Sequence, residues 1–213
     1  MARKRRGVER TKEKASWLGP DLIHLLQERG YHVGTSVVSA FLLSEARLCS
    51  RRASRAVRAK DLGREAGASA SAILDSAAAC EARLSEYLAH VEYSNGPAAP
   101  DLAAVRSNRN AQLQWKQLFN ELAPHIELRD NYRQLGCLMR LRDVVAHRNS
   151  RLRLIGDFPP TLAECVRAGV IPVRHPSFGY WALDVLSAVT AKWAASVATE
   201  WIAFAEETFP IGC

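Results

Sequence analysis

The sequence predicts an all-α fold, namely an up-and-down four-helix bundle with an extra helical segment on its amino-terminal side. Apolar residues recur at steps of three and four in several long stretches, which is the period of an amphipathic helix. No stretch alternates apolar and polar residues for the length of a strand, and the sequence contains no internal repeat. Hydrophobic residues make up 48% of the 213 positions, so the chain has the composition and length to bury one ordinary core.

Composition sets the amino-terminal part apart from the rest of the chain. Residues 1–16 are rich in Arg and Lys and have almost no large apolar side chain, which predicts a disordered basic tail. Residues 17–65 are expected to form a helical extension, with a short helix over 17–30 and a longer one over 36–60.

A domain boundary is expected near residue 66, because glycine and serine concentrated just after it weaken helix continuation. Residues 66–213 should then hold the bundle, whose four helices are predicted at about 73–94, 106–122, 130–147 and 180–209. A proline-rich insertion at about 150–179 separates the last two helices. It is expected to contain one small helix over 161–168, which Thr161 could cap.

The net charge of the chain indicates a class of partner, and its cysteine content indicates the compartment. A net charge of +7, from 29 Lys+Arg against 22 Asp+Glu, favours polyanionic partners such as nucleic acid. Five scattered cysteines without a C-x-x-C pair suggest neither a disulfide framework nor a zinc site. The sequence contains no export signal, and charged residues interrupt its longest apolar stretch. We therefore expect a cytoplasmic protein that does not enter a membrane and uses neither metal nor cofactor.

A row of arginines is predicted on the longer helix of the amino-terminal extension. Arg47, Arg51, Arg55 and Arg58 recur at steps of four, four and three, so on a helix they form one basic stripe. Such a stripe is able to follow a phosphate backbone, which makes Arg51, Arg55 and Arg58 candidate nucleic-acid contacts. An ordinary solvated helix face explains the same pattern equally well.

The residues most suggestive of chemistry lie at the end of the third bundle helix. Arg142, Asp143 and His147 bring a guanidinium, a carboxylate and an imidazole within six positions. The guanidinium presents a planar fork of donors that matches phosphate oxygens, and the imidazole can take and give a proton near neutral pH. Residues five apart on a helix are separated by about 140°. Either the helix loosens at His147, or two chains share the site.

The segment from Arg142 to His147 resembles the R-x4-6-H motif of HEPN domains, the higher eukaryotes and prokaryotes nucleotide-binding family, including a polar residue directly after the arginine. The alanine-rich segment from Ser71 to Leu84 is similar to the first helix of many such domains, and the resemblance covers residues 69–209. It implies a four-helix bundle that dimerises so that two motifs form one composite cleft. It also implies a metal-independent endoribonuclease, often a toxin or an antiphage defence effector.

The resemblance implies a role for each residue of the motif. Arg142 would hold the scissile phosphate and its developing charge, and His147 would act as general acid or base while the RNA's own 2′-hydroxyl attacks. Asp143 would orient Arg142 or His147. Local pairing with Arg140 or Arg148 is the alternative role of Asp143.

Three supporting residues complete the expected site. Glu81, on the first bundle helix, would reach Arg142 and fix the direction of its guanidinium. Arg148 and Asn149 follow the motif directly and are its remaining polar candidates.

The sequence leaves three functional hypotheses open. The first is a homodimeric endoribonuclease that acts on RNA and is restrained by an antitoxin or regulatory protein. The second is a non-catalytic dimerisation or nucleic-acid-binding module that uses the arginine stripe. The third is a regulatory subunit of another protein. In the last two, His147 would interact with the final helix carbonyls and Arg142 would form an ordinary ion pair.

Overall fold

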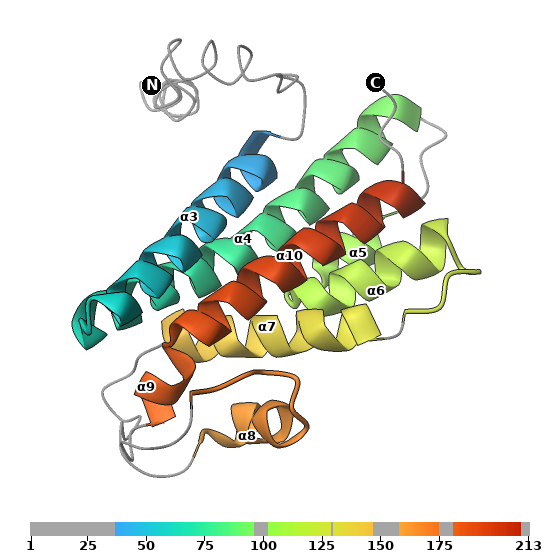
Figure 1. Ribbon diagram of the computed structural model, residues 1–213. Helices are drawn as coiled ribbons and strands as arrows, with labels where there is room; N and C mark the ends of the chain where they lie inside the picture. Colours follow the sequence, from blue (N-terminus) through green and yellow to red (C-terminus); the bar gives the residue numbers. More distant parts are fainter. Residues whose placement is uncertain (1–36, 96–101, 129, 147–157, 175–180, 210–213) are drawn as a thin grey trace, which may run out of the picture. The chain divides into compact units, whose positions relative to one another are not determined.

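The computed structural model of the chain describes residues 37–95, 102–128, 130–146, 158–174 and 181–209 (Figure 1). Every regular element in these ranges is a helix, so the predicted all-α class is confirmed there. The helices are α3 (Val37–Arg58), α4 (Leu62–Asn95), α5 (Ala103–Ser107), α6 (Ala111–Leu122), α7 (Asp130–Ala146), α8 (Pro160–Arg167), α9 (Trp181–Val185) and α10 (Ala188–Thr208). None of the described helices combines the length and the apolar character that a membrane crossing requires.

Helices α4, α6, α7 and α10 pack around one hydrophobic core (Figure 1). The contact between α4 and α10 is the most extensive, and α7 packs against both. In Figure 1 the short helices α8 and α9 lie on the side of this group where α7 runs. This arrangement is compatible with the predicted bundle.

Trp115 of α6 joins three of these helices in the core. Its ring is fully buried and meets Tyr87 of α4 and Trp201 of α10 edge to face, with centroids 5.9 and 5.5 Å apart. Its indole Nε1–H donates to the carbonyl of Cys80, 3.3 Å away. Edge-to-face pairs of this kind add to the free energy gained by burying the rings. The tryptophan therefore fixes how α6 lies against α4 and α10.

Helix α3 packs against α4 and α10 through small residues, in a second buried cluster. Cys49 and Ala53 of α3 form a buried cluster with Ala72 of α4 and Ala191 of α10. At the other end of α3, the backbone N–H and the hydroxyl of Ser39 donate to the carboxylate of Glu86, at 3.0 and 2.7 Å. A carboxylate from α4 thus satisfies donors at the amino end of α3.

The boundary that the sequence suggested near residue 66 falls inside α4. This helix runs without interruption from Leu62 to Asn95, through Gly67. Alanines around the glycine are strong helix formers, and the buried Glu65 joins this turn to Ala188 and Arg174. Residues Val38–Cys213 form one compact unit, so α3 and the bundle belong together.

Two of the expected helices are each divided by a polar cap. The helix expected over 106–122 consists of α5 and α6, because the side chain of Asn110 accepts a hydrogen bond from Leu113 N–H and starts α6. The helix expected over 180–209 consists of α9 and α10, because Ser187 caps α10. Such side chains offer the backbone an alternative to helix continuation.

The small helix within the proline-rich insertion is present as α8. It begins one residue earlier than expected: Pro159 occupies the cap position and Pro160 the first turn, so Thr161 does not cap it. Proline suits this position, because its missing N–H would have no partner there. The expected tail at 1–16 and the helix over 17–30 lie outside the described residues.

A buried carboxylate connects α4 to the start of α10. The side chain of Glu65 is almost wholly buried, accepts a hydrogen bond from Ala188 N–H at 2.9 Å and forms an ion pair with Arg174. Ala188 is the first residue of α10, where helix N–H groups have no partner within the helix. Glu65 therefore satisfies both a helix terminus and a guanidinium.

We expect Glu65→Ala to lower the free energy of unfolding by about 2–3 kcal/mol, because it leaves Arg174 and the Ala188 N–H without their acceptor. Urea denaturation followed by circular dichroism measures the change. Glu65→Gln is the matched variant: it keeps an oxygen for Ala188 and should lose clearly less. Equal stability of both variants and the natural protein would show that the buried contact contributes nothing.

Candidate functional site

Arg142 lies just before the last turn of α7 and is held by a carboxylate from α4. Its Nη2 lies 2.6 Å from Glu81 Oε1, and its Nη1 lies 3.3 Å from Glu81 Oε2. Two parallel N–H···O bonds of this kind fix both the position and the plane of a guanidinium. The contact that the sequence suggested between these two residues is therefore present, and its role in catalysis stays a prediction.

Asp143 approaches the same guanidinium from the other side. Its Oδ1 lies 2.9 Å from Arg142 Nε, close enough for an ion pair. The Nε atom is buried and has no hydrogen-bond partner, so this contact is electrostatic rather than a directed hydrogen bond. The side chain of Asp143 is 58% exposed, against 28% for Arg142. Asp143 is thus the more exposed partner, against 36% for Glu81, and Glu81 is the one that makes two hydrogen bonds.

Helix stability does not account for Asp143 at this position. The carbonyl end of a helix carries partial negative charge, which disfavours a carboxylate in the last turn by about 0.3–1 kcal/mol. Of the two local partners considered for it, Arg140 instead lies 3.5 Å from Glu164 of α8. Asp143 therefore pairs with Arg142 and leaves Arg140 to α8.

The arrangement defines what Arg142 can do chemically. A guanidinium has five N–H donors. Glu81 uses two, and a weak 4.0 Å contact with the sulfur of Met139 uses a third. Donors remain on Nε and Nη1. Two carboxylates already surround one cation, so an incoming phosphate binds only if Asp143 turns away into solvent.

Three of the expected site residues, His147, Arg148 and Asn149, lie outside the described residues. Helix α7 ends at Ala146, directly before them.

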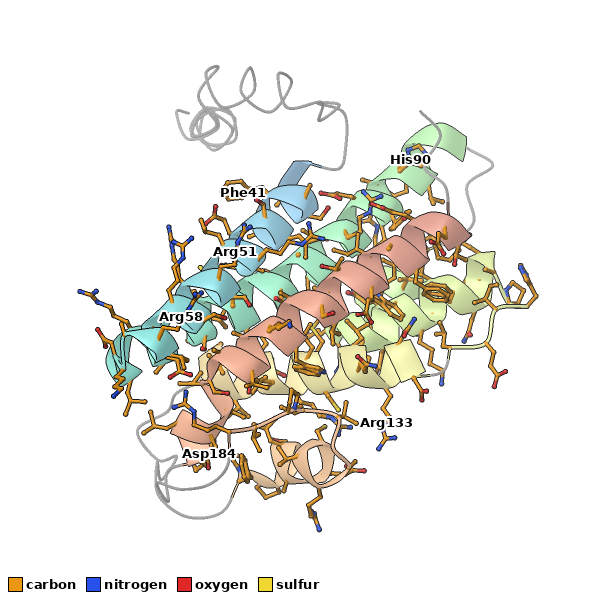
Figure 2. The ribbon with its side chains drawn as sticks, in the orientation of Figure 1. Phe41, Arg51, Arg58, His90, Arg133 and Asp184 are labelled. Carbon is orange, nitrogen blue, oxygen red and sulfur yellow. The ribbon has the colours of Figure 1, made fainter. Side chains whose placement is uncertain are left out.

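The arginine stripe of α3 is exposed as expected from its spacing. Arg51, Arg55 and Arg58 are exposed, and their side chains have no hydrogen bond or ion pair with other described residues. Figure 2 shows Arg51 and Arg58 projecting from α3. Arg47, the fourth member, instead donates to Thr199 Oγ1 of α10 at 3.1 Å. The three free arginines are available to an anionic partner.

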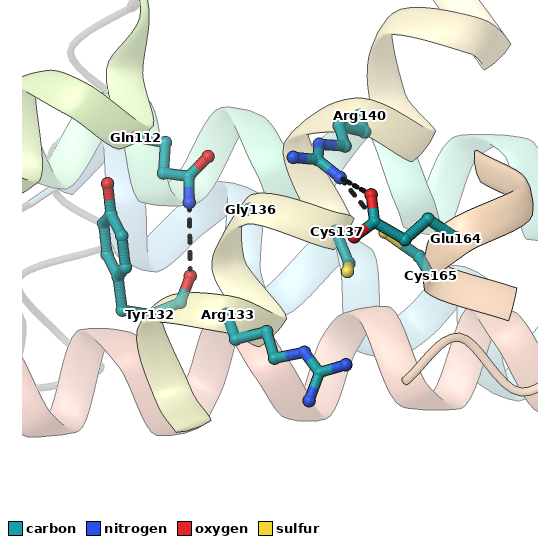
Figure 3. Close-up of a pocket in the computed structure, with 8 residues that line it drawn as sticks. All are labelled: Gln112, Tyr132, Arg133, Gly136, Cys137, Arg140, Glu164 and Cys165. Atoms are coloured by element: carbon teal, nitrogen blue, oxygen red, sulfur yellow. Dashed lines mark hydrogen bonds and ion pairs between the residues drawn. The ribbon is translucent and has the colours of Figure 1, made fainter. Parts of the chain in front are cut away.

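A cleft that was not predicted from the sequence lies between α6, α7 and α8 (Figure 3). Its volume is about 280 Å³, and its lining includes Arg133, Gly136 and Arg140 of α7. These residues recur at steps of three and four, a signal that is readable in the sequence. It was overlooked because the same spacing also describes the apolar, core-facing side of α7.

Within the described part of the chain, no group of three or more His, Cys, Asp or Glu side chains is arranged to hold a metal ion. Cys49, Cys80, Cys137 and Cys165 are buried free thiols. Burial raises the pKa of Cys137 to about 12, so this thiol remains protonated at neutral pH. The described cysteines therefore act as small core residues.

No family model, curated protein or solved structure matches this chain. The assignment to HEPN domains rests on the residues alone and stays a prediction.

We expect Glu81→Ala to destabilise the protein by about 1–2 kcal/mol, because it leaves a half-buried guanidinium paired only with an exposed carboxylate. Glu92 provides the control, since its ion pair with Arg106 is equally short at 2.7 Å but exposed on both sides. Glu92→Ala should cost no more than about 0.5 kcal/mol. Chemical denaturation measures the free energy of unfolding of both variants. A smaller decrease for Glu81→Ala than for Glu92→Ala would contradict the fixed role of Glu81.

Proposed function

We propose that this chain is a metal-independent endoribonuclease of the HEPN type, with Arg142 and His147 as its catalytic pair. The observation that carries the proposal is the guanidinium of Arg142, which Glu81 aligns at the end of α7, five positions before His147 in the sequence. A cation fixed in direction by the fold suits a transition state with negative charge on phosphate oxygens. The positive net charge of the chain supports RNA as the substrate class.

The proposed reaction is an internal transfer within RNA. The imidazole of His147 takes the proton of a 2′-hydroxyl, whose oxygen attacks the neighbouring phosphorus and forms a 2′,3′-cyclic phosphate. The bond from phosphorus to the 5′-oxygen breaks, and that oxygen receives a proton from an imidazolium of the composite site or from water, which gives a 5′-hydroxyl end; the proton that His147 took up is returned in this step or to solvent. Arg142 donates to the non-bridging oxygens as their charge grows. No metal takes part.

Asp143 and Glu81 are positioning residues in this proposal. Glu81 holds two N–H groups of Arg142, so the guanidinium has little rotational freedom to lose when RNA binds. Asp143 balances the charge of Arg142 until a phosphate replaces it. Arg148 and Asn149 follow His147 in the sequence and are proposed as further phosphate contacts.

The complete site requires two copies of the chain in this proposal. On a regular helix Arg142 and a residue five positions later point about 140° apart, so one copy does not bring both to one phosphate. A homodimer in which two motifs face each other does. We propose a toxin or antiphage effector whose activity is restrained by an antitoxin or regulatory protein.

We expect the purified protein to cut single-stranded RNA and to leave DNA of the same sequence whole, because DNA lacks the 2′-hydroxyl. His147→Ala and Arg142→Ala should each lower the rate by at least about 10²-fold, the usual contribution of one acid–base or oxyanion group. Gel analysis of labelled RNA with excess chelator measures the rates. Arg106→Ala is the control, because Arg106 forms an exposed ion pair on another helix.

Equal cutting by His147→Ala and the natural sequence would remove His147 from the mechanism. Loss of activity with chelator, or cutting of DNA, would contradict the proposed mechanism and indicate a metal-dependent one.

A non-catalytic nucleic-acid-binding module is the second candidate, favoured by the exposed and unpaired Arg51, Arg55 and Arg58 of α3 (Figure 2). In this case RNA binds and remains whole. Replacing the three arginines by glutamine should reduce the slope of log affinity against log salt by about 3 units, about one for each phosphate contact.

A further inference from the structure

A second basic stripe lies on α7, on the side away from Arg142. Arg133, Gly136, Cys137 and Arg140 stand at offsets of zero, three, four and seven, which places them on one face of the helix. Arg142 follows Arg133 by nine residues and therefore points about 180° from it. This face is separate from the proposed catalytic pair.

The two central residues of the stripe are small, so a side chain from a neighbouring helix approaches the backbone of α7 closely there. The amide of Gln112, from α6, lies directly over Gly136, and a Cβ added to this glycine would overlap the amide atoms. Glu164 and Cys165 of α8 form the opposite wall (Figure 3). The result is the open cleft of about 280 Å³, with a guanidinium at each end of its floor.

The two guanidiniums are available to a ligand. The exposed side chain of Arg133 has no hydrogen bond or ion pair with other described residues (Figure 3). Arg140 has a 3.5 Å ion pair with Glu164, whose side chain is 78% exposed, and a 3.7 Å contact with Cys165 Sγ. Exposed pairs of this length contribute little, so a phosphate can replace Glu164. The protonated thiol of Cys137 adds no negative charge.

The amide of Gln112 has unused hydrogen-bonding capacity. Among the described residues its one hydrogen bond is long, 3.5 Å, from Nε2 to the carbonyl of Tyr132. An amide presents an acceptor and two donors side by side, the pattern that the edge of a nucleobase complements. The cleft thus combines a base-reading group with two arginines whose backbone positions lie about 10 Å apart along the helix axis.

We propose that this cleft binds a nucleotide, with its phosphate on Arg133 or Arg140 and its base against the Gln112 amide. The nucleotide is either one unit of an RNA strand or a free nucleotide, since both present the same chemistry. The second guanidinium would hold a neighbouring phosphate of the strand or a further phosphate of the free ligand. This proposal stands whether or not the chain cleaves RNA.

Binding of a short fluorescein-labelled RNA, methylated at every 2′-oxygen so that it resists cleavage, tests the cleft by fluorescence anisotropy. The variant is Arg133→Gln with Arg140→Gln. Its control is Arg64→Gln with Arg167→Gln, which removes two exposed arginines that do not line the cleft. We expect the cleft variant to bind at least about tenfold more weakly at low salt, with a salt slope about 2 units smaller. The control should change little.

Unlabelled AMP, ADP and inorganic pyrophosphate distinguish the sources of the nucleotide. Displacement of the RNA by ADP at similar concentration identifies a free nucleotide as the ligand, and resistance to all three identifies the strand. Gln112→Leu should weaken binding of RNA or ADP but leave pyrophosphate binding unchanged. Thermal unfolding of each variant confirms that it is folded.

Binding by the cleft variant that equals that of its control overturns the proposal, as does failure of the natural protein to bind any of these probes. Cleavage of unmodified RNA is measured separately. Loss of the nucleotide site therefore leaves the proposed catalytic pair standing, and absence of cleavage leaves the nucleotide site standing.

Discussion

The ion pair between Glu81 and Arg142 is the constraint on which the proposed site depends. It joins α4 to the carboxyl-terminal part of α7, two helices that already share the core. The direction of the guanidinium is therefore set when the bundle folds, and the conformational entropy of a long side chain is lost at that stage rather than when a substrate binds. The same pair neutralises Arg142 in the absence of an anion. Asp143 is the exposed second partner of Arg142, and it is the partner that a phosphate would replace.

Helix α7 carries two separate basic surfaces because its buried residues divide its circumference. Leu135, Leu138 and Leu141 are fully buried and commit one face to the core. The polar residues are thereby confined to two remaining strips, one with Arg142 toward α4 and one with Arg133 and Arg140 toward α6 and α8. A single helix thus presents an arginine held between two carboxylates on one side, and on the other Arg133 together with Arg140, whose ion-pair partner Glu164 is exposed. This difference distinguishes the proposed catalytic arginine from the proposed nucleotide cleft.

Periodicity in the sequence was enough to predict α3 and α7 to within two residues, because long apolar stripes record which face is buried. The division between α9 and α10 could not be predicted in the same way. It depends on Ser187 and on a carboxylate more than a hundred positions away, Glu65, whose burial has no periodic signal. In the site, Asp143 was found beside Arg142 because they are adjacent. The cleft was missed because its walls come from three helices, and spacing along one helix does not show what packs over Gly136.

A crystal structure of the protein with an RNA methylated at the scissile 2′-oxygen tests the central claim most directly. The account predicts that Arg142 keeps its two hydrogen bonds to Glu81, that Asp143 has turned away, and that a phosphate oxygen lies within hydrogen-bonding distance of the guanidinium, with His147 of a second copy beside the blocked 2′-oxygen. A structure in which Arg142 retains both carboxylates while the RNA lies elsewhere would contradict it.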